Sequence, residues 1–522
     1  MNEVHKYNGF RLLELEVVKN KIFGNIHFKF VEDSDLQNQF YTSVIIGPNG
    51  TRKSYLLNII IKLFRQISEY KQNKKITEPV TGGFYLKYSL NGEIIEFKNF
   101  DRKEGDLFIG ESNKTIQVTF YKNGIPTDIE KIDLPISISA SSMMLNDKFP
   151  FIRKEGFEIY NYLGLRNTPQ TASTSSHIRK TVNFIVNTLD IPALIEGIRK
   201  MSNELLELEG NITISYRTKN TPVFFRNLTE DIFDDYFQKI AIRYQDSKTE
   251  PPYKLGYYLN NFKEKSVFKN ELLDYCRNIS NKLEHIKKSS AKWLRFDLMK
   301  EEDIKLLRKD YKIIESLRKL GVLAEPSLDI ISDKNNNDIL KYHMGESSSG
   351  EYNIITSFIA LMASVQVDSL VLIDEPEVSL HPNWQMKYLN FMRDLFSNEF
   401  YKTCHFIIAT HSHFILSDLR GINSKIIGLA KEDRGVKLIS FSNGIDTFGW
   451  SAEQVLLEIF NVPTTRNYYL ETKVAEILEL MADSNSSNKI IKEKIVGLKS
   501  LNLELRKEDP MSEIMSALFS KI

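Results

Sequence analysis

A glycine-containing segment between an apolar run and an apolar helix constrains this chain more than any other feature. The run Ser43-Val44-Ile45-Ile46 precedes GPNGTRKS at 47–54, and residues 55–64 are apolar on most faces. This pattern predicts a buried strand, a tight loop and a buried helix. Such a junction directs backbone N–H groups and the positive end of the helix dipole toward one point, which favours binding of phosphate.

The loop itself nearly matches the phosphate-binding pattern GxxxxGK[ST]. In that pattern the Lys53 ammonium would reach the β- and γ-phosphates, and the Ser54 hydroxyl would ligate Mg²⁺. One position departs, because Arg52 stands where glycine normally precedes the lysine. Taken alone, the segment could also be a Gly/Asn turn before a helix. The remaining predicted nucleotide contacts come from Asn49, Gly50, Thr51 and Arg52.

A second motif is the apolar run from Ser369 to Ile373, which ends in two carboxylates. A buried strand would deliver Asp374 to the magnesium ion, and Glu375 could act as the general base that polarises the attacking water. An acidic strand end is common in α/β proteins, so the motif gains weight from its pairing with the phosphate loop.

Two further motifs lie on either side of this acidic strand. Ser347-Ser348-Ser349-Gly350-Glu351 precedes an apolar helix at 354–365, and a serine and a glycine at a helix N-terminus can bind an anion. The simpler interpretation is a serine N-cap. The strand-like run at 405–410 ends in His411, and a single histidine at a strand end is usually structural.

In this order the four motifs resemble the ATP-binding-cassette class of ATPase heads, the class of SMC, RecF and overcoming-lysogenization-defect proteins. GPNGTRKS corresponds to Walker A, SSSGE to the signature, LVLIDEPEVSLHP to Walker B and ATHSH to the switch histidine. The continuation DEPEVSLHP is typical of the bacterial AAA-type branch. The resemblance implies ATP and Mg²⁺ as cofactors, and catalytic roles for Glu375 and His411. It also implies a homodimer or higher oligomer, in which Ser348 and Gly350 close on the γ-phosphate held by another subunit.

The expected fold is an α/β ATP-binding-cassette-type head, with a mixed sheet, a phosphate-loop helix and an antiparallel β-subdomain. Residues 1–165 and 326–450 would form this head, 166–325 a mainly helical insertion and 451–522 a helical tail. Asn-Gly turns at 91–92 and 123–124 predict hairpins, as does 326–344, and 211–217 predicts a strand. Residues 165–179 are polar and predict a loop. No glutamine can be assigned to a Q-loop, which is expected near 136–142.

The stretch 282–320 reads as helical and holds twelve Lys or Arg against seven Asp or Glu, interleaved with Trp293, Phe296 and Tyr311. It could bind a nucleic-acid backbone, or it could be a helical hairpin with a solvated charged face.

Composition excludes several classes. The formal charge is +1, so a globally basic nucleic-acid coat is excluded. The chain has only two cysteines, which rules out a disulfide framework, and its longest near-apolar stretch, 358–365, is too short to cross a bilayer. We therefore expect a cytoplasmic protein without a membrane partner. The segment after His411 lacks an Asp-x-Asp pair, so we expect no fused nuclease.

The tail from Thr447 to Phe460, followed by Arg466, resembles ATPases of bacterial anti-phage operons, such as the Septu ATPase subunit and retron-associated ATPases. It could equally be an amphipathic helix that completes the head. The leading hypothesis is a regulatory ATPase of prokaryotic defence that senses an invader and controls a separately encoded nuclease or toxin. The alternatives are a RecF/SMC-like DNA-repair ATPase and a slow-turnover, ATP-locked scaffold.

Overall fold

The computed structural model shows an α/β protein that divides into two compact units, residues 1–448 and 449–522. Among the residues it describes, no helix has both the length and the apolarity needed to cross a membrane. The described residues are 9–31, 39–73, 80, 82–99, 118–151, 157–166, 174–205, 210–218, 225–245, 253–262, 267–279, 284–285, 292–334, 338–343, 348–398, 401–417, 419–432, 435–439, 447, 449–460, 462, 466–483, 487–503, 505 and 509–521.

A seven-stranded sheet forms the centre of the first unit, in the order β18-β17-β3-β16-β15-β8-β9. Neighbouring strands from β17 to β9 are parallel, and only β18 is antiparallel to its neighbour. The strands are β3 (Tyr41–Ile46), β8 (Ile138–Ser142), β9 (Tyr160–Tyr162), β15 (Leu370–Asp374), β16 (His405–Thr410), β17 (Ser424–Glu432) and β18 (Gly435–Ile439).

The register of this sheet brings three of the sequence motifs to one edge. Asp374 pairs with Ala409 of β16, and Thr410 pairs with Ile46 of β3. Because the strands are parallel, the phosphate loop, Glu375 and His411 all follow strand ends at the same edge. Open α/β sheets bind ligands at this carboxyl edge.

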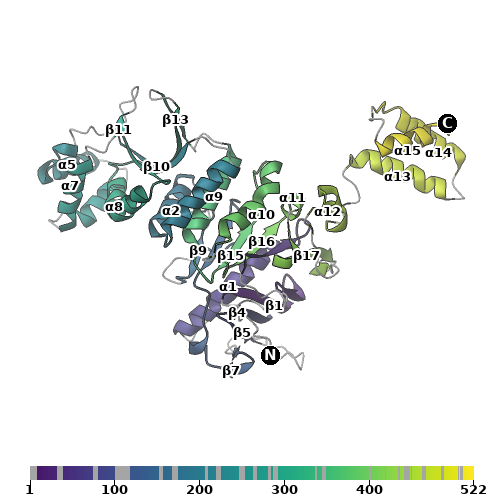
Figure 1. Ribbon diagram of the computed structural model, residues 1–522, viewed down its shortest axis with the longest axis horizontal. Coiled ribbons are helices and arrows are strands. Elements are labelled where there is room, and N and C mark those ends of the chain that lie inside the picture. The colour runs from purple at the N-terminus through teal and green to yellow at the C-terminus, as the bar shows by residue number, and fades with distance from the viewer. Residues whose placement is uncertain are drawn as a thin grey trace. The chain divides into compact units, whose positions relative to one another are not determined.

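Both faces of the sheet are covered, which explains why its strands are apolar throughout rather than alternating. On one face, Leu370 and Ile407 share a core with the helix α1 (Lys53–Asn73). On the other face, Phe406 packs against Phe396 of α10 (Pro382–Phe396), with ring centroids 5.0 Å apart. Figure 1 shows α10 and α9 (Ser349–Ser364) above the strands and α1 below them. The short α11 (His413–Leu416) follows β16.

An antiparallel six-stranded sheet packs on α1, in the order β2-β1-β4-β5-β6-β7. Turns at 91–92 and 123–124 connect β4 to β5 and β6 to β7, which confirms the two predicted hairpins. Phe64 of α1 contacts Tyr88 of β4, with ring centroids 5.4 Å apart. The strands are β1 (Arg11–Asn20), β2 (Gly24–Lys29), β4 (Gly83–Leu90), β5 (Glu93–Lys98), β6 (Thr119–Lys122) and β7 (Ile125–Thr127).

Between β9 and β15 the chain contains helices and a five-stranded sheet of order β11-β12-β10-β13-β14. The strand predicted at 211–217 and the hairpin predicted at 326–344 are both confirmed. The elements are α2 (Thr174–Asn187), α3 (Ile191–Lys200), η4 (Met201–Leu205), β10 (Asn211–Thr218), α5 (Glu230–Gln245), α6 (Tyr253–Asn261), α7 (Val267–Ile279), β11 (Glu284–His285), β12 (Lys292–Asp297), α8 (Glu301–Lys319), β13 (Ser327–Lys334) and β14 (Asp338–His343).

Two expectations in this region are wrong. Residues 282–320 are not wholly helical, because 292–297 form the strand β12, which pairs with β10. Lys292, Trp293 and Leu294 are each at most 9% exposed, so this strand is buried on both faces. The loop predicted at 165–179 is also partly wrong, because α2 begins at Thr174 and packs its Ile178 inward.

The second unit is helical over its described residues, with α12 (Ala452–Glu458), α13 (Tyr468–Ala482), α14 (Asn488–Lys499) and α15 (Pro510–Phe519). Leu470 and Ile477 of α13 share a small core with Ile495 of α14 and Met515 of α15. Val455, the centre of the predicted amphipathic helix, is fully buried.

Candidate nucleotide-binding site

Lys53 is the first residue of α1, directly after the phosphate loop, and only 4% of it is exposed. Its Nζ donates to the Gly47 carbonyl at 2.9 Å and lies 2.6 Å from His411 Nε2. Burial lowers the pKa of Lys53 to about 8, although the nearby carboxylates Glu375, Glu377 and Asp374 oppose this shift. The ammonium is therefore desolvated but held at the mouth of the loop, where a phosphate could contact it.

Gly50 and Arg52, in the phosphate loop, both have a positive φ. Gly50 has φ +88°, and Arg52 has φ +67°, a left-handed conformation that favours glycine. Arg52 thus adopts the conformation that the usual glycine would supply, and its side chain is exposed. Thr51 is buried, and its hydroxyl donates to the Pro48 carbonyl at 2.9 Å, whereas Asn49 is exposed.

Ser54 and Asp374 meet as the sequence predicts, since the Ser54 hydroxyl donates to Asp374 Oδ1 at 3.0 Å. Asp374 is 1% exposed, and its Oδ2 accepts no hydrogen bond from any described residue. Burial raises the pKa of Asp374 to about 7, while the bond from Ser54 lowers it. A buried oxygen without a partner, beside a hydroxyl, is the kind of oxygen donor set that suits Mg²⁺. These residues therefore fit the ion.

His411 and Glu375 complete the cluster. His411 Nε2 lies 3.5 Å from Glu375 Oε1, and both side chains remain about one quarter exposed, at 28% and 23%. Burial, and next the charge of Lys53, lower the pKa of His411 to about 4, so the imidazole is neutral near pH 7 and can accept from Lys53. Lys53, Ser54, Asp374, Glu375 and His411 thus lie together at one edge of the sheet.

Glu377 and Gln385 hold the segment around His411 in place, and neither was singled out from the sequence. Glu377 accepts from the His411 N–H at 2.5 Å and from the Thr410 hydroxyl at 2.8 Å, and Ser412 donates to Gln385 at 2.6 Å. Burial raises the pKa of Glu377. The second glutamate of DEPE was the available sign, but only the fold shows that it binds the end of the neighbouring strand β16.

The described contacts of Ser348 and Gly350 lie within α9 and the loop after β15, not at the phosphate loop. Ser348 caps α9, with its hydroxyl accepting from the Glu351 N–H at 3.2 Å, and Glu351 accepts in return from the Ser348 N–H at 2.9 Å. A Cβ on Gly350 would come within 2.5 Å of the Ser379 carbonyl oxygen. The simpler interpretation, a serine N-cap, is therefore confirmed, and a role on another subunit stays a prediction. Ser347 lies outside the described residues.

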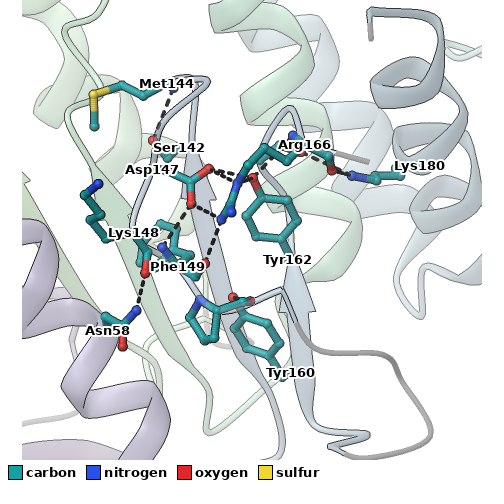
Figure 2. A network of polar contacts seen from close by, with 12 residues as sticks. Asn58, Ser142, Met144, Asp147, Lys148, Phe149, Tyr160, Tyr162, Arg166 and Lys180 are labelled. Carbon is teal, nitrogen blue, oxygen red and sulfur yellow. Dashed lines mark hydrogen bonds and ion pairs between the residues drawn. The ribbon is translucent and has the colours of Figure 1, made fainter. Parts of the chain in front are cut away.

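Where a Q-loop was expected, the segment after β8 carries a buried acid rather than a glutamine. Arg166 contacts Asp147 twice, with Nη2–Oδ1 2.5 Å and Nε–Oδ2 3.0 Å, and the Tyr162 hydroxyl donates to Oδ2 at 2.6 Å. Figure 2 shows the network extending from Asn58 of α1, which donates to the Lys148 carbonyl, across to Lys180 of α2. Burial is the largest cause that raises the pKa of Asp374, and the negative charge of Asp147 raises it further.

Lys431 is another basic residue beside the loop, and it was not singled out from the sequence. It is the penultimate residue of β17, and a Cβ on Gly50 would come within 3.0 Å of Lys431 Cε. The phosphate loop packs closely against β17 at a second point. A Cβ on Gly47 would lie 2.4 Å from the Leu429 carbonyl oxygen. Lys431 therefore adds a second ammonium near the phosphate loop.

The basic stretch 282–320 lies outside this cluster. Its Lys287 and Lys288 are outside the described residues, and Lys292 is buried in β12. A nucleic-acid contact through this stretch stays a prediction.

The parallel sheet, the phosphate loop and the clustered Lys53, Asp374 and His411 define the class of this protein, an ATPase head of the ATP-binding-cassette type. The chain belongs to the family described as "AAA domain, putative AbiEii toxin, Type IV TA system", whose model matches residues 43–417, well over half of the chain.

Several known proteins are similar to parts of this chain. The "Septu protein PtuA" of Bacillus thuringiensis is 22% identical over 42% of this chain and 55% of its own length. The "Retron Vc95 probable ATPase" of Vibrio cholerae serotype O1 biovar El Tor is 27% identical over 38% of this chain and 40% of its own length. The chain thus spans about half the length of these relatives, or less. The solved SMC head domain from Thermotoga maritima is 12% identical, with a TM-score of 0.31 over 83% of this chain and 99% of that chain.

Proposed function

We propose that this chain binds ATP with Mg²⁺ and hydrolyses it. The observation that carries the proposal is the meeting of Lys53, the Ser54–Asp374 pair and the Glu375–His411 pair at the carboxyl edge of one sheet. Lys53 and the loop N–H groups would bind the phosphates, and Ser54 and Asp374 would hold Mg²⁺, which neutralises phosphate charge when bound. Glu375 would accept the proton of the attacking water, and His411 would contact the γ-phosphate.

The signature residues extend the proposal to an oligomer. Ser348 and Gly350 lie at the start of α9, where a helix N-terminus favours an anion. We propose that they complete the site of a second copy, so that two heads close around ATP in a homodimer or larger assembly. The proposed head comprises 1–165 and 326–450, and it is interrupted by the insertion 166–325 and followed by the tail 451–522.

The biological role that we propose is control of a separately encoded nuclease or toxin in prokaryotic anti-phage defence. Family membership and similarity to a Septu protein and a retron ATPase support this role over a DNA-repair role. The partner, the trigger and any nucleic-acid contact belong to the proposal, because the chain spans only part of those relatives.

Two substitutions test the site. Glu375→Gln should keep ATP affinity but lower hydrolysis by on the order of 100-fold or more, because an amide cannot accept the proton of water. It should also accumulate an ATP-dependent dimer in size-exclusion chromatography. Lys53→Ala should weaken ATP binding at least about tenfold, because it removes the cation beside the triphosphate.

Glu301→Gln is the matched control, because Glu301 is exposed on α8 and pairs only with Lys305 among the described contacts. Its hydrolysis rate should equal that of the wild type. Normal hydrolysis in Glu375→Gln, or normal ATP affinity in Lys53→Ala, would contradict the assignment of the site.

A further inference from the structure

A second concave site lies away from the phosphate loop, between β9 and the helices α2 and α8. Its volume is about 360 Å³, which falls within the range of pockets that hold small organic ligands. Residues from three separate parts of the chain line it, including Phe151 before β9, Arg179 of α2 and Tyr311 of α8. The fold thus forms this pocket from the head and the region between β9 and β15 together.

The charges at the pocket favour an anion. Arg179 and Lys180 are both basic, and Glu315 is the acid among the lining residues. That acid is engaged by Arg318, which contacts it with Nη2–Oε2 2.8 Å and Nε–Oε1 3.0 Å. Arg179 reaches Glu325 only at 3.5 Å, and both side chains are more than one third exposed, so this exposed contact is weak.

Lys180 is held at the pocket wall by neutral groups. Its ammonium donates to the Arg166 carbonyl and lies 5.1 Å from the centre of the Tyr162 ring. Burial, and then the neighbouring charges of Arg166 and Arg179, lower the pKa of Lys180 to about 8. A bound anion would raise the pKa of Lys180 again, because it would stabilise the ammonium charge that burial and the two arginines disfavour.

Aromatic rings give the pocket a preference for a planar group. Phe151 is 36% exposed, and Phe184 and Tyr311 are partly exposed, so their rings can be reached. Tyr162 is less suitable, because Arg166 and Lys180 already lie over its ring. Nucleobases stack on such rings whatever their sequence, because every base has a π-face.

Amide side chains at the pocket could contact the edges of a base. Asn161 of β9 and Asn183 of α2 both line the space, and an amide offers a donor and an acceptor to a base edge. We propose that this pocket binds a nucleobase that carries a phosphate, with the base against Phe151, Phe184 or Tyr311 and the phosphate at Arg179 and Lys180. The source of that group is either a free nucleotide or one nucleotide of a single strand.

The pocket is physically connected to the ATP site. Lys180 and Tyr162, which line it, also belong to the network of Figure 2, in which Tyr162 and Arg166 hold Asp147. The next residue, Lys148, accepts from Asn58 of α1, the helix that begins with Lys53. A ligand at Lys180 would therefore contact one end of a network whose other end is Asn58, in the phosphate-loop helix α1.

The test uses the full-length chain with Lys53→Ala, so that the phosphate loop does not compete for the probe. The probes are adenosine monophosphate and a 5′-phosphorylated penta-adenylate, measured by calorimetry. One saturable site per chain is expected for at least one probe. Adding Arg179→Ala and Lys180→Ala should weaken it about tenfold or more, and adding Phe151→Ala should weaken it severalfold. Stronger binding of the monophosphate indicates a free nucleotide, and stronger binding of the oligomer indicates a single strand.

Lys239→Ala is the control, because Lys239 is a basic residue of α5 that is 68% exposed, lies outside 282–320 and does not line the pocket. It should leave probe affinity unchanged. Arg179→Glu alone is a second test, since the exposed Arg179 side chain can be reversed without disturbing the core, and circular dichroism should confirm its folding. The proposal is overturned if neither probe saturates, or if affinity stays the same in the folded pocket variants. Neither result depends on ATP hydrolysis.

Discussion

At the scale of single residues, two positions of the candidate nucleotide site adopt a left-handed backbone that side chains rarely accept. Arg52 has φ +67° and Glu375 has φ +49°. Each costs about 1–2 kcal/mol relative to glycine. For Glu375, the N–H donates to the Ala409 carbonyl at 2.8 Å, which fixes this conformation and points the carboxylate toward His411. Strain of this kind persists where the surrounding structure imposes it, often at functional sites.

The first prediction concerns Arg52, where the chain departs from the usual phosphate loop. Arg52→Gly should raise the free energy of unfolding by about 1 kcal/mol, because glycine accepts the left-handed conformation without strain. The midpoint of urea unfolding without nucleotide measures this effect. Arg52→Ala is the control, since it removes the guanidinium but keeps the Cβ, and it should not gain stability.

Steady-state ATP hydrolysis by the same two variants distinguishes an effect of the guanidinium charge from an effect of the backbone conformation. If the guanidinium slows turnover, both variants should hydrolyse ATP faster. If the backbone conformation limits the rate, only Arg52→Gly should be faster. A glycine variant no more stable than the alanine variant would show that Arg52 is not strained.

At the scale of elements, one glycine determines how closely α9 approaches the loop after β15. Gly350 is buried, and a Cβ there would be 2.5 Å from the Ser379 carbonyl and 3.3 Å from Trp384. The first atom belongs to backbone and cannot turn aside. The helix can therefore lie this close to the loop only because residue 350 is glycine.

Gly350→Ala should lower the free energy of unfolding by about 1–3 kcal/mol, since the backbone of the loop must move. It should also prevent the proposed ATP-dependent dimer while leaving ATP affinity of the monomer nearly unchanged. Gly256→Ala in α6 is the matched control, because nothing lies within 4 Å of a Cβ there. The expected result for that control is equal or higher stability. Equal midpoints for Gly350→Ala and wild type would argue against the close approach.

The elements show which features a sequence can predict. The strands at 43–46, 369–373 and 405–409 are mostly apolar runs followed by motif residues, so their positions followed from pattern. Their shared edge is a property of the parallel register. The strand β12 was missed because its sequence, KWLRFD, lies within a strongly charged stretch that reads as helical. Nothing in that sequence indicates that the charged Lys292 is buried, at only 9% exposure. The Asp147–Arg166 pair could not be predicted, since it exists only once β8 and β9 are neighbours in the sheet.

At the scale of the whole molecule, the chain consists of two compact units, and all the described contacts of Lys53, Ser54, Asp374 and His411 lie within 1–448. A chain ending at residue 448 should therefore fold and bind ATP with an affinity within about threefold of the full chain. Calorimetry with both chains measures this, and Lys53→Ala in the shorter chain is the control for binding at the loop. A loss of tenfold or more, or failure to fold, would support the alternative that the segment after 448 completes the head.

The strand order of the central sheet also determines when that sheet can form during synthesis. β3 and β8 are made early, but they are not neighbours, because β16 and β15 lie between them. A ribosome must therefore extend the nascent chain past Asp374 before β8 gains β15 as a partner, and past Thr410 before β3 gains β16. Until then, apolar strand edges from the first 142 residues await pairing, a state that favours aggregation and recruits chaperones. Expression yield should depend on chaperone supply more than on any surface residue of the finished protein.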